Sequence, residues 1–291
     1  MVGVANGTSL PVTVVQGRGI ETAPLETVNY ERLTKNDSLE IQKLFRVAQS
    51  PGFFYLDLQR GTPQDGYLTD LKGLYKLGES YYSQSKEVKM KDFRKDQDRG
   101  YKSDIDAETF EIAREEAFNT SSASFPASMR SHSGLIKDFI SSSHTITMTM
   151  LSHLSDSMGL EGDARFEHRH RDGQSSDCAL KMESAPMWDR LEDIPPSEHT
   201  DMGTLTLLFC DDYTTQLRIP GTEDTWAFIN PKPGHAIVNV ADSLQAMSDK
   251  KLLSCLHRVS QPVPGAKNRF CVLYYLRPEH AWLNQRKEES N

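Results

Sequence analysis

Two histidines and one aspartate have the types and the spacing that an open metal site needs. His199 and Asp201 flank Thr200 in the run SEHTDMGTLTLLF, and His257 lies in the run LHRVSQPVPG. On a β-strand, residues i and i+2 point to the same face, so His199 and Asp201 can reach one metal ion while Thr200 points away. Two histidines and one carboxylate are the ligands of non-haem iron(II) sites, which leave coordination positions open for a cosubstrate and O2.

An arginine follows the second histidine in the sequence and could bind the far end of a ligand that chelates the metal. Arg269 is twelve positions after His257 and begins a strand-like apolar run that ends at Leu276. A guanidinium binds a carboxylate through two parallel hydrogen bonds. We therefore predict that Arg269 holds the distal carboxylate of a dicarboxylate that chelates the metal at its other end.

Several longer phrases carry a family resemblance. The runs EHTDMGTLTLLF, PKPGHAIVNVADSLQ, LHRVSQP and RFCVLYYLRPE occur in that order, and APLETVNYERL and AQSPGFFYLDL precede them. With these phrases the chain resembles the 2-oxoglutarate/iron(II)-dependent dioxygenases, specifically the isopenicillin N synthase-like branch and its fungal natural-product enzymes. The resemblance covers most of the chain, from roughly residue 24 to residue 282.

The resemblance implies a fold, a set of cofactors and a reaction. The fold is mixed α/β, with a double-stranded β-helix (jelly roll) core braced by N-terminal helices. Fe(II) is expected on His199, Asp201 and His257, with 2-oxoglutarate and O2 as cosubstrates, and Arg269 and Cys271 are expected to bind the 2-oxoglutarate. The reaction would oxidise a small secondary metabolite, by hydroxylation, desaturation or ring rearrangement, with release of succinate and CO2.

Two other functions stay open. In an oxidase like isopenicillin N synthase, no 2-oxoglutarate is used and Arg269 would hold the carboxylate of the substrate itself. If the chain is instead a catalytically weak homologue, it would support a partner subunit. The sequence is compatible with a homo-oligomer and with a hetero-oligomer. Succinate formation separates the first alternative from the leading function, and iron content with 2-oxoglutarate affinity separates the second.

Two positions depart from the pattern of the family. The family usually has Ser or Thr two residues after the arginine, whereas this chain has Cys271, whose thiol is a weak hydrogen-bond donor. The strand before the first histidine usually carries an Asn or Tyr that helps to hold 2-oxoglutarate, and here that stretch reads LKMESAP, with Glu183-Ser184-Ala185 in it. The resemblance therefore implies a weakened cosubstrate site, for which Lys181 or Ser184 could compensate.

Composition and charge describe an ordinary globular chain. Its 291 residues, 37% hydrophobic and 25% charged, suit one large domain or two intimate ones. A formal net charge of -8 argues against nucleic acid or an anionic membrane as a partner. The first twenty residues lack the pattern of a signal peptide, and the four cysteines show no CxxC spacing, so we expect a reducing, cytoplasmic location.

The first half of the chain predicts helices, and the second half predicts short strands. We place the boundary near residue 160, with a supporting region (1–160) and a jelly-roll core (161–291) that form one intimate unit. The first half is expected to contain an arm (1–23), a helix (36–48), a strand (53–56), a helix (62–81), an irregular stretch (100–131) and a helix (135–159). The expected strands are Cys178–Met182, His199–Phe209, Gln216–Ile219, Thr225–Ile229, Ala236–Val240, Cys255–Val259 and Phe270–Leu276.

Other residues with reactive side chains have simpler interpretations. His168 and His170 have chelating spacing, but the polar run FEHRHRDGQ around them indicates an exposed turn. Asp242 is expected to begin a short helical stretch. The alternating apolar residues of 205–209 are expected to continue the iron-bearing face, and Arg258 should point away from it. Candidate substrate contacts are Tyr101, Lys102, Phe110 and Trp282.

Overall fold

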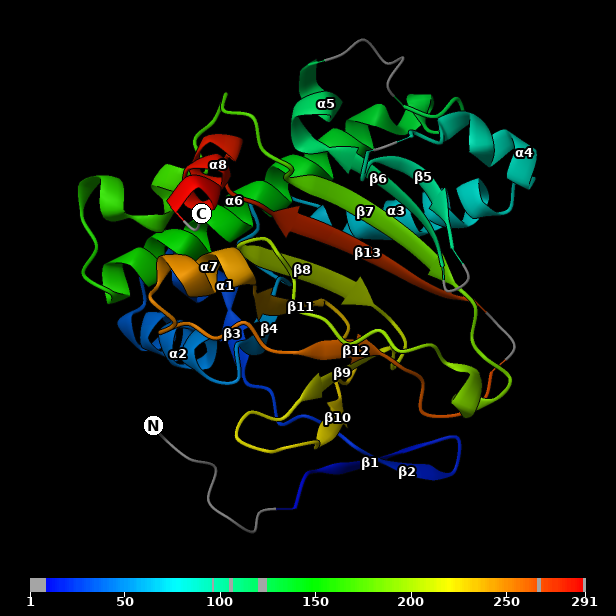
Figure 1. Cartoon of the computed structure of the whole chain (residues 1–291), viewed down its shortest axis with the longest axis horizontal. Coiled ribbons are helices and arrows are strands. Elements are labelled where there is room, and N and C mark those ends of the chain that lie inside the picture. Colours follow the sequence, from blue (N-terminus) through cyan, green and yellow to red (C-terminus); the bar gives the residue numbers. More distant parts are fainter. Residues whose placement is uncertain (1–8, 96, 105–106, 120–124, 266–267, 290–291) are drawn as a thin grey trace.

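An eight-stranded sheet, a three-stranded sheet, a two-stranded hairpin and a layer of helices make up the computed structural model of the chain, which describes residues 9–95, 97–104, 107–119, 125–265 and 268–289 (Figure 1). The large sheet has the strand order β3-β4-β11-β8-β13-β7-β6-β5, and the small sheet has the order β10-β9-β12. The large sheet consists of β3 (Thr27–Asn29), β4 (Phe53–Asp57), β5 (Gly100–Ser103), β6 (Glu108–Ala113), β7 (Ala179–Ala185), β8 (Leu205–Cys210), β11 (His235–Val240) and β13 (Arg269–Leu276). The small sheet consists of β9 (Thr215–Arg218), β10 (Trp226–Phe228) and β12 (His257–Val259).

The helices come mostly from the first half of the chain, as predicted. α2 begins where the sequence indicated, α6 covers the third predicted helix, and α3 begins later than expected because residues 62–66 form a turn. The helices are α1 (Tyr30–Thr34), α2 (Ser38–Gln49), α3 (Tyr67–Tyr82), α4 (Lys86–Lys89), α5 (Arg114–Asn119), α6 (Ser133–Ser157), α7 (Asp242–Met247) and α8 (His280–Glu289).

The alternation of side chains along each strand divides the large sheet into a helix face and a site face. On β13, Val272 and Tyr274 are fully buried in the main hydrophobic core, which α3 and α6 cover. The residues that alternate with them, Cys271 and Leu273, point to the opposite face and line a cavity. Because side chains alternate with a period of two, one apolar face builds the core while the other is free to carry chemistry. This arrangement confirms the predicted mixed α/β fold with a jelly-roll core.

Strands from both sides of residue 160 share the large sheet. β6 pairs with β7 over six residue pairs, from Glu108 opposite Ser184 to Ala113 opposite Ala179. β4 pairs with β11 in the same way. The division at residue 160 stays a prediction, and the first part contributes strands as well as bracing helices.

The stretch that we expected to be irregular forms β5 and β6, so that expectation is wrong. Tyr101 and Phe110 lie opposite each other in this hairpin and are buried in the core on the helix face. They therefore cannot be substrate contacts, whereas Lys102 points to the site face and lines a cavity there. The expected N-terminal arm also contains a hairpin, β1 (Val12–Val15) with β2 (Arg18–Glu21), while residues 1–8 lie outside the described residues.

The segment 199–209 is not one strand. His199 forms an isolated bridge to His257 beside the small sheet, and the chain then crosses to the large sheet, where β8 begins at Leu205. The crossing changes which residues face the iron-binding triad. Leu205, Leu207 and Phe209 pack in the core on the helix face, contrary to our expectation, and Thr206 and Leu208 line the site instead.

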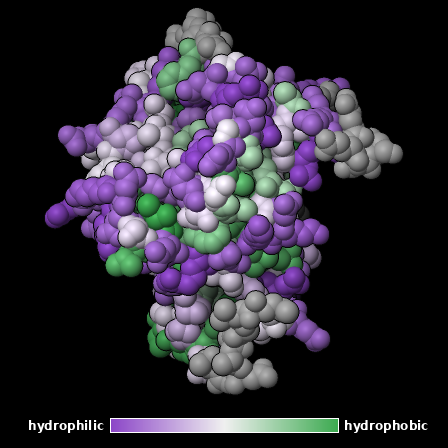
Figure 2. Space-filling view, turned by 90° about the vertical axis from the view of Figure 1, so that its left-hand side faces the viewer, coloured by the Kyte–Doolittle hydropathy of each residue, from purple (hydrophilic) through white to green (hydrophobic). Residues whose placement is uncertain are grey.

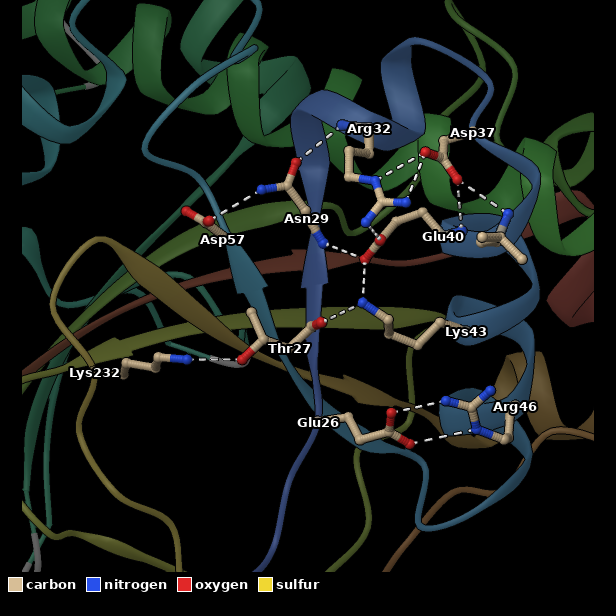
Figure 3. A network of polar contacts seen from close by, with 11 residues as sticks. Glu26, Thr27, Asn29, Arg32, Asp37, Glu40, Lys43, Arg46, Asp57 and Lys232 are labelled. Atoms are coloured by element: carbon tan, nitrogen blue, oxygen red, sulfur yellow. Dashed lines mark hydrogen bonds and ion pairs between the residues drawn. The ribbon is translucent and has the colours of Figure 1, made fainter.

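A buried carboxylate fixes α2 against the edge of the large sheet (Figure 3). Glu40 is fully buried, and its Oε1 accepts hydrogen bonds from the backbone N–H of Asn29 and from Lys43, each at 2.7 Å. Arg32 approaches the other carboxylate oxygen at 3.1 Å. Asp37 caps the helix by accepting hydrogen bonds from the backbone N–H groups of Leu39 and Glu40. These contacts hold α2 against β3, the edge strand of the large sheet.

The face of the molecule shown in Figure 2 is mostly hydrophilic. On the face shown in Figure 2, hydrophobic residues gather only in small separated patches. No helix in the described ranges is long and apolar enough to cross a membrane.

Candidate active site

Three side chains converge between the two sheets with their metal-binding atoms together. One ligand atom from each of His199, Asp201 and His257 lies within 4.8 Å of the others. Oδ1 of Asp201 is 3.9 Å from Nε2 of each histidine, and the two imidazole rings are 4.3 Å apart. Among the described residues this is the one group of its kind. The three residues predicted from the sequence are therefore brought together, although Asp201 and His257 are 56 positions apart in the chain.

The backbone determines which imidazole nitrogen faces the centre of the triad. Nδ1 of His199 lies 2.6 Å from the carbonyl oxygen of Ser197, and Nδ1 of His257 lies 3.1 Å from that of Cys255. A carbonyl oxygen only accepts hydrogen bonds, so each Nδ1 carries the proton and each Nε2 presents a lone pair towards Asp201. This tautomer is the one that a metal ion needs.

Two residues that the sequence analysis missed orient the aspartate. The side chains of Thr206 and Asn239 both donate to Oδ2 of Asp201, at 2.6 and 2.8 Å. Thr200, which points away from the triad as predicted, donates to Asp242 at the start of α7. Thr206 lies on β8 and Asn239 lies on β11. No motif in the sequence indicated that either side chain would contact Asp201.

Charge in the triad favours an ionised Asp201 beside a neutral His257. Burial would raise the pKa of Asp201, but His257 and the hydrogen bonds from Thr206 and Asn239 hold it below its usual value. Burial lowers the pKa of His257, which keeps its imidazole neutral. A carboxylate and two neutral imidazoles are the protonation states that bind a divalent cation, so the donor set fits Fe(II).

Arg269 lies in the same cavity as the triad. This inner cavity, of about 150 Å³, is lined by the triad and by residues of β7, β8 and β13, among them Arg269 and Cys271. The arginine is 7% exposed, and its Nε has no hydrogen-bond partner among the described residues. A buried guanidinium with an unused donor fits an anionic ligand.

Two charged residues of β7 border the arginine. Nζ of Lys181 lies 3.1 Å from Oε2 of Glu183, and Oε1 of Glu183 lies 3.5 Å from Arg269. Burial would raise the pKa of Glu183, but Lys181 and Arg269 hold it below its usual value, so the carboxylate is ionised. Burial would lower the pKa of Lys181, but Tyr275 and Glu183 raise it, so the amine is charged.

Cys271 lies on the site face directly opposite Glu183 on β7 and Cys210 on β8. Its thiol lies 2.9 Å from Sγ of Cys210. The hydrogen bond to Cys210 and burial raise the pKa of Cys271, so this sulfur stays protonated. Arg269 and Cys271 therefore share the cavity. The sequence predicted this, because residues i and i+2 of a strand point to the same face.

An outer cavity continues from the inner one. It measures about 480 Å³ and shares Lys181, Glu183, Val259, Arg269 and Tyr275 with the inner cavity. Its other charged lining residues are Asp98, Lys102, Asp104, Glu111 and Arg277. A space of this size, which shares part of its lining with the cavity of the triad and is rich in charge, can hold a small polar molecule.

The remaining candidates of the sequence lie elsewhere. His170 is buried, contrary to the exposed turn that we expected, and it is hydrogen-bonded to Phe166 and Thr204. The guanidinium of Arg258 points towards Glu198 and over the ring of Trp226, as predicted, although the residue also lines the inner cavity. Trp282 lies in α8, where Arg286 stacks on its ring.

Comparison with known proteins gives one consistent family. Residues 176–278 match the model of the 2OG-Fe(II) oxygenase superfamily. Over 285 residues the chain is 33% identical to the 2-oxoglutarate-dependent dioxygenase frbH of Dothideomycetidae sp., covering 92% of this chain and 87% of that one. Over 159 residues it is 42% identical to the 2-oxoglutarate-dependent dioxygenase iboH of Amanita muscaria, covering 54% of this chain and 77% of that one.

Solved structures share the fold. A full-length Neurospora crassa protein in complex with α-ketoglutarate is similar with a TM-score of 0.73 and 21% identity, covering 92% of this chain and 87% of that one. The dioxygenase for auxin oxidation of rice is similar with a TM-score of 0.70 and 20% identity, covering 88% of this chain and 84% of that one.

Proposed function

Because this chain belongs to the 2OG-Fe(II) oxygenase superfamily, and is a 2-oxoglutarate-dependent dioxygenase, we propose roles for its individual residues and a class of substrate. His199, Asp201 and His257 hold Fe(II). Arg269 holds the distal carboxylate of 2-oxoglutarate, and Cys271 lies beside that carboxylate. The observation that carries this assignment is the convergence of the triad and a buried, partly unpaired arginine in one cavity.

The protein positions the reactants and keeps competing groups away. When bound, Fe(II) with 2-oxoglutarate and O2 supplies an oxidant that removes hydrogen from a C–H bond, with release of succinate and CO2. Thr206 and Asn239 hold one oxygen of Asp201, so that the other faces the metal position. The carbonyl oxygens of Ser197 and Cys255 hold the two imidazoles in the binding tautomer.

The substrate in this proposal is a small polar secondary metabolite. The outer cavity carries acidic and basic side chains on the strands that border the triad, including Glu111, Lys181 and Arg277. A wholly apolar molecule would remove these charges from water without replacing the lost hydrogen bonds, which is unfavourable. A metabolite with charged or hydrogen-bonding groups therefore fits the cavity better. Hydroxylation, desaturation and ring rearrangement are all compatible with this placement.

Release of succinate tests the proposal. The Fe(II) protein is supplied with 2-oxoglutarate, O2 and a panel that pairs polar metabolites, such as amino acids and hydroxy acids, with neutral polyketides and terpenes. We expect a polar member to stimulate succinate formation and to be oxidised in equal amount, and Asp201→Ala should abolish both. Oxidation of a substrate without consumption of 2-oxoglutarate would contradict the proposal and support an oxidase like isopenicillin N synthase.

A cytoplasmic location belongs to the same proposal. All four cysteines are buried, and the sulfur atoms of Cys210 and Cys271 lie 2.9 Å apart, so an oxidising compartment would favour a disulfide between them. Thiols this close persist in a reducing compartment. Alkylation of the unfolded protein directly after cell lysis tests this, because labelling at all four cysteines is expected.

A further inference from the structure

A row of charged side chains with alternating sign crosses the site face of the large sheet. We call the residues Arg277, Glu111, Lys181, Glu183 and Arg269 the charge row. Glu111 on β6 is paired opposite Lys181 on β7. The ion-pair distances lengthen along the row, from 2.8 Å between Arg277 and Glu111, through 3.1 Å between Lys181 and Glu183, to 3.5 Å between Glu183 and Arg269. The arginine at the metal end is therefore the most loosely paired member.

Glu183 lies between two cations, at the border of the inner and outer cavities. Lys181 and Glu183 are two residues apart on β7, so they point to the same face, and both line both cavities. Their side chains are 23% and 18% exposed, and that of Arg269 is 8% exposed. In this surrounding a charge needs a partner of opposite sign. Glu183 therefore supplies the negative charge that Arg269 requires while no cosubstrate is bound.

The contact between Glu183 and Arg269 is weaker than a fully formed ion pair. Charge-assisted N–H···O hydrogen bonds are about 2.7–2.9 Å long, whereas these atoms are 3.5 Å apart. The Nε of Arg269 has no partner among the described residues. The guanidinium is held in place, but its hydrogen-bonding capacity is left for another carboxylate.

From this geometry we propose that Glu183 is an internal placeholder for the distal carboxylate of 2-oxoglutarate, and that Lys181 retains Glu183 when Arg269 turns to the cosubstrate. Lys181 and Glu183 are then positioning residues, which act through Arg269 on the affinity and selectivity for a dicarboxylic keto acid. The inference rests on the proposed function, because it takes 2-oxoglutarate as the ligand of Arg269.

The charge balance of the site explains why Lys181 must accompany Glu183. Arg269 and Lys181 contribute two positive charges and Glu183 one negative charge, which leaves one net positive charge. Fe(II) with ionised Asp201 also leaves one, so the dianion 2-oxoglutarate makes the whole site neutral. Without Lys181, Glu183 would cancel Arg269 and repel the cosubstrate, because like charges at close range disfavour each other.

Equilibrium binding to the Fe(II) protein without O2 tests the proposal, because it requires no turnover. Each variant is titrated with 2-oxoglutarate and with 2-oxobutyrate, which has the same chelating end but no distal carboxylate. We expect Lys181→Met to weaken 2-oxoglutarate binding by roughly tenfold or more, and Glu183→Gln to strengthen it by several-fold. Binding of 2-oxobutyrate should stay within about twofold of the parent in both variants.

The chain offers a matched pair of controls. Lys89 and Glu108 form an ion pair at 2.7 Å. Glu108 lies on β6, as Glu111 does, but its side chain is on the helix face of the sheet, away from the charge row. Lys89→Met and Glu108→Gln make the same chemical changes and should leave 2-oxoglutarate affinity at the parental value. Lys181→Arg keeps the charge, and it should bind 2-oxoglutarate nearly as the parent does if Lys181→Met does not fold.

The outcomes separate this inference from the proposed function. Weaker 2-oxoglutarate binding by Glu183→Gln would overturn the inference, since it would make Glu183 a support for Arg269 and not its competitor. Equal effects on 2-oxobutyrate would overturn it too, because the distal carboxylate would not be involved. Failure of the parent protein to bind 2-oxoglutarate, or binding that Arg269→Met leaves unchanged, would instead contradict the proposed function.

Discussion

The amide of Asn239 donates a 2.8 Å hydrogen bond to Oδ2 of Asp201, which leaves Oδ1 facing the two histidines. The hydroxyl of Thr206 donates to the same Oδ2. The carboxylate therefore cannot rotate freely, and one defined oxygen is presented to the metal position. Support of this kind commonly decides how tightly a metal is held.

Removal of these supports should weaken metal binding while all three ligands stay in place. Asn239→Leu and Thr206→Val should each lower the Fe(II) affinity by roughly 10- to 100-fold, measured by anaerobic titration. Thr206→Ser keeps the hydroxyl and should bind like the parent. Parental affinity in both Asn239→Leu and Thr206→Val would show that the carboxylate needs no support.

Substitution of a ligand should have a larger effect than substitution of its supports. His257→Ala and Asp201→Ala should contain no stoichiometric iron after anaerobic reconstitution, because two remaining donors hold a divalent ion weakly. His168→Ala is the control, since that histidine is half-buried, lies outside the triad and has its Nδ1 3.2 Å from Asp163. Full iron content in His257→Ala would disprove the assignment of the triad.

Arg269 should matter for the cosubstrate and not for the metal. Arg269→Met removes a charge-assisted contact, so the affinity for 2-oxoglutarate should fall by about two orders of magnitude or more, with Fe(II) affinity nearly unchanged. Arg46→Met is the control, because that side chain pairs with Glu26 and lines neither the inner nor the outer cavity. An equal loss in both variants would indicate a general effect of removing an arginine.

A hydroxyl at position 271 should improve the cosubstrate site. Cys271 shares the site face with Arg269, and its weakly donating thiol contacts Cys210. Cys271→Ser should strengthen 2-oxoglutarate binding by roughly fivefold, which corresponds to one net hydrogen bond of about 1 kcal/mol. Calorimetric titration of the Fe(II) forms measures the change, with Cys210→Ser as the control. Equal or weaker binding would mean that Cys271 only fills space.

Acid should destabilise the fold through His170. Burial lowers the pKa of His170 to about 4, whereas an unfolded histidine titrates near 6.5. The neutral imidazole therefore stabilises the fold fully above about pH 6.5, and this stabilisation is lost as the pH falls through about 4. Denaturant unfolding of the metal-free protein should show a smaller pH slope in this range for His170→Gln than for the parent.

The spacing of residues along the chain was sufficient to identify the metal-binding and cosubstrate-binding candidates. His199 and Asp201 at i and i+2, the separate His257, and Arg269 two positions before Cys271 were all identified from strand geometry or motif. For Arg269 and Cys271 this works because a strand determines locally which side chains share a face, whereas His199 and Asp201 lie outside the regular strands and were identified as a motif. The long helices α2 and α6 were predicted for the same reason, since their apolar spacing is also a local property.

The pairing of strands decided the rest. Thr206 and Asn239 reach Asp201 only because β8 and β11 pair in one register, and Glu183 reaches Arg269 only because β7 pairs with β13. The prediction for 205–209 had the wrong face because the chain changes sheets between His199 and Leu205, which resets the alternation. Contacts between distant strands depend on register and on sheet crossings, and these are set by packing of the whole core and not by local sequence.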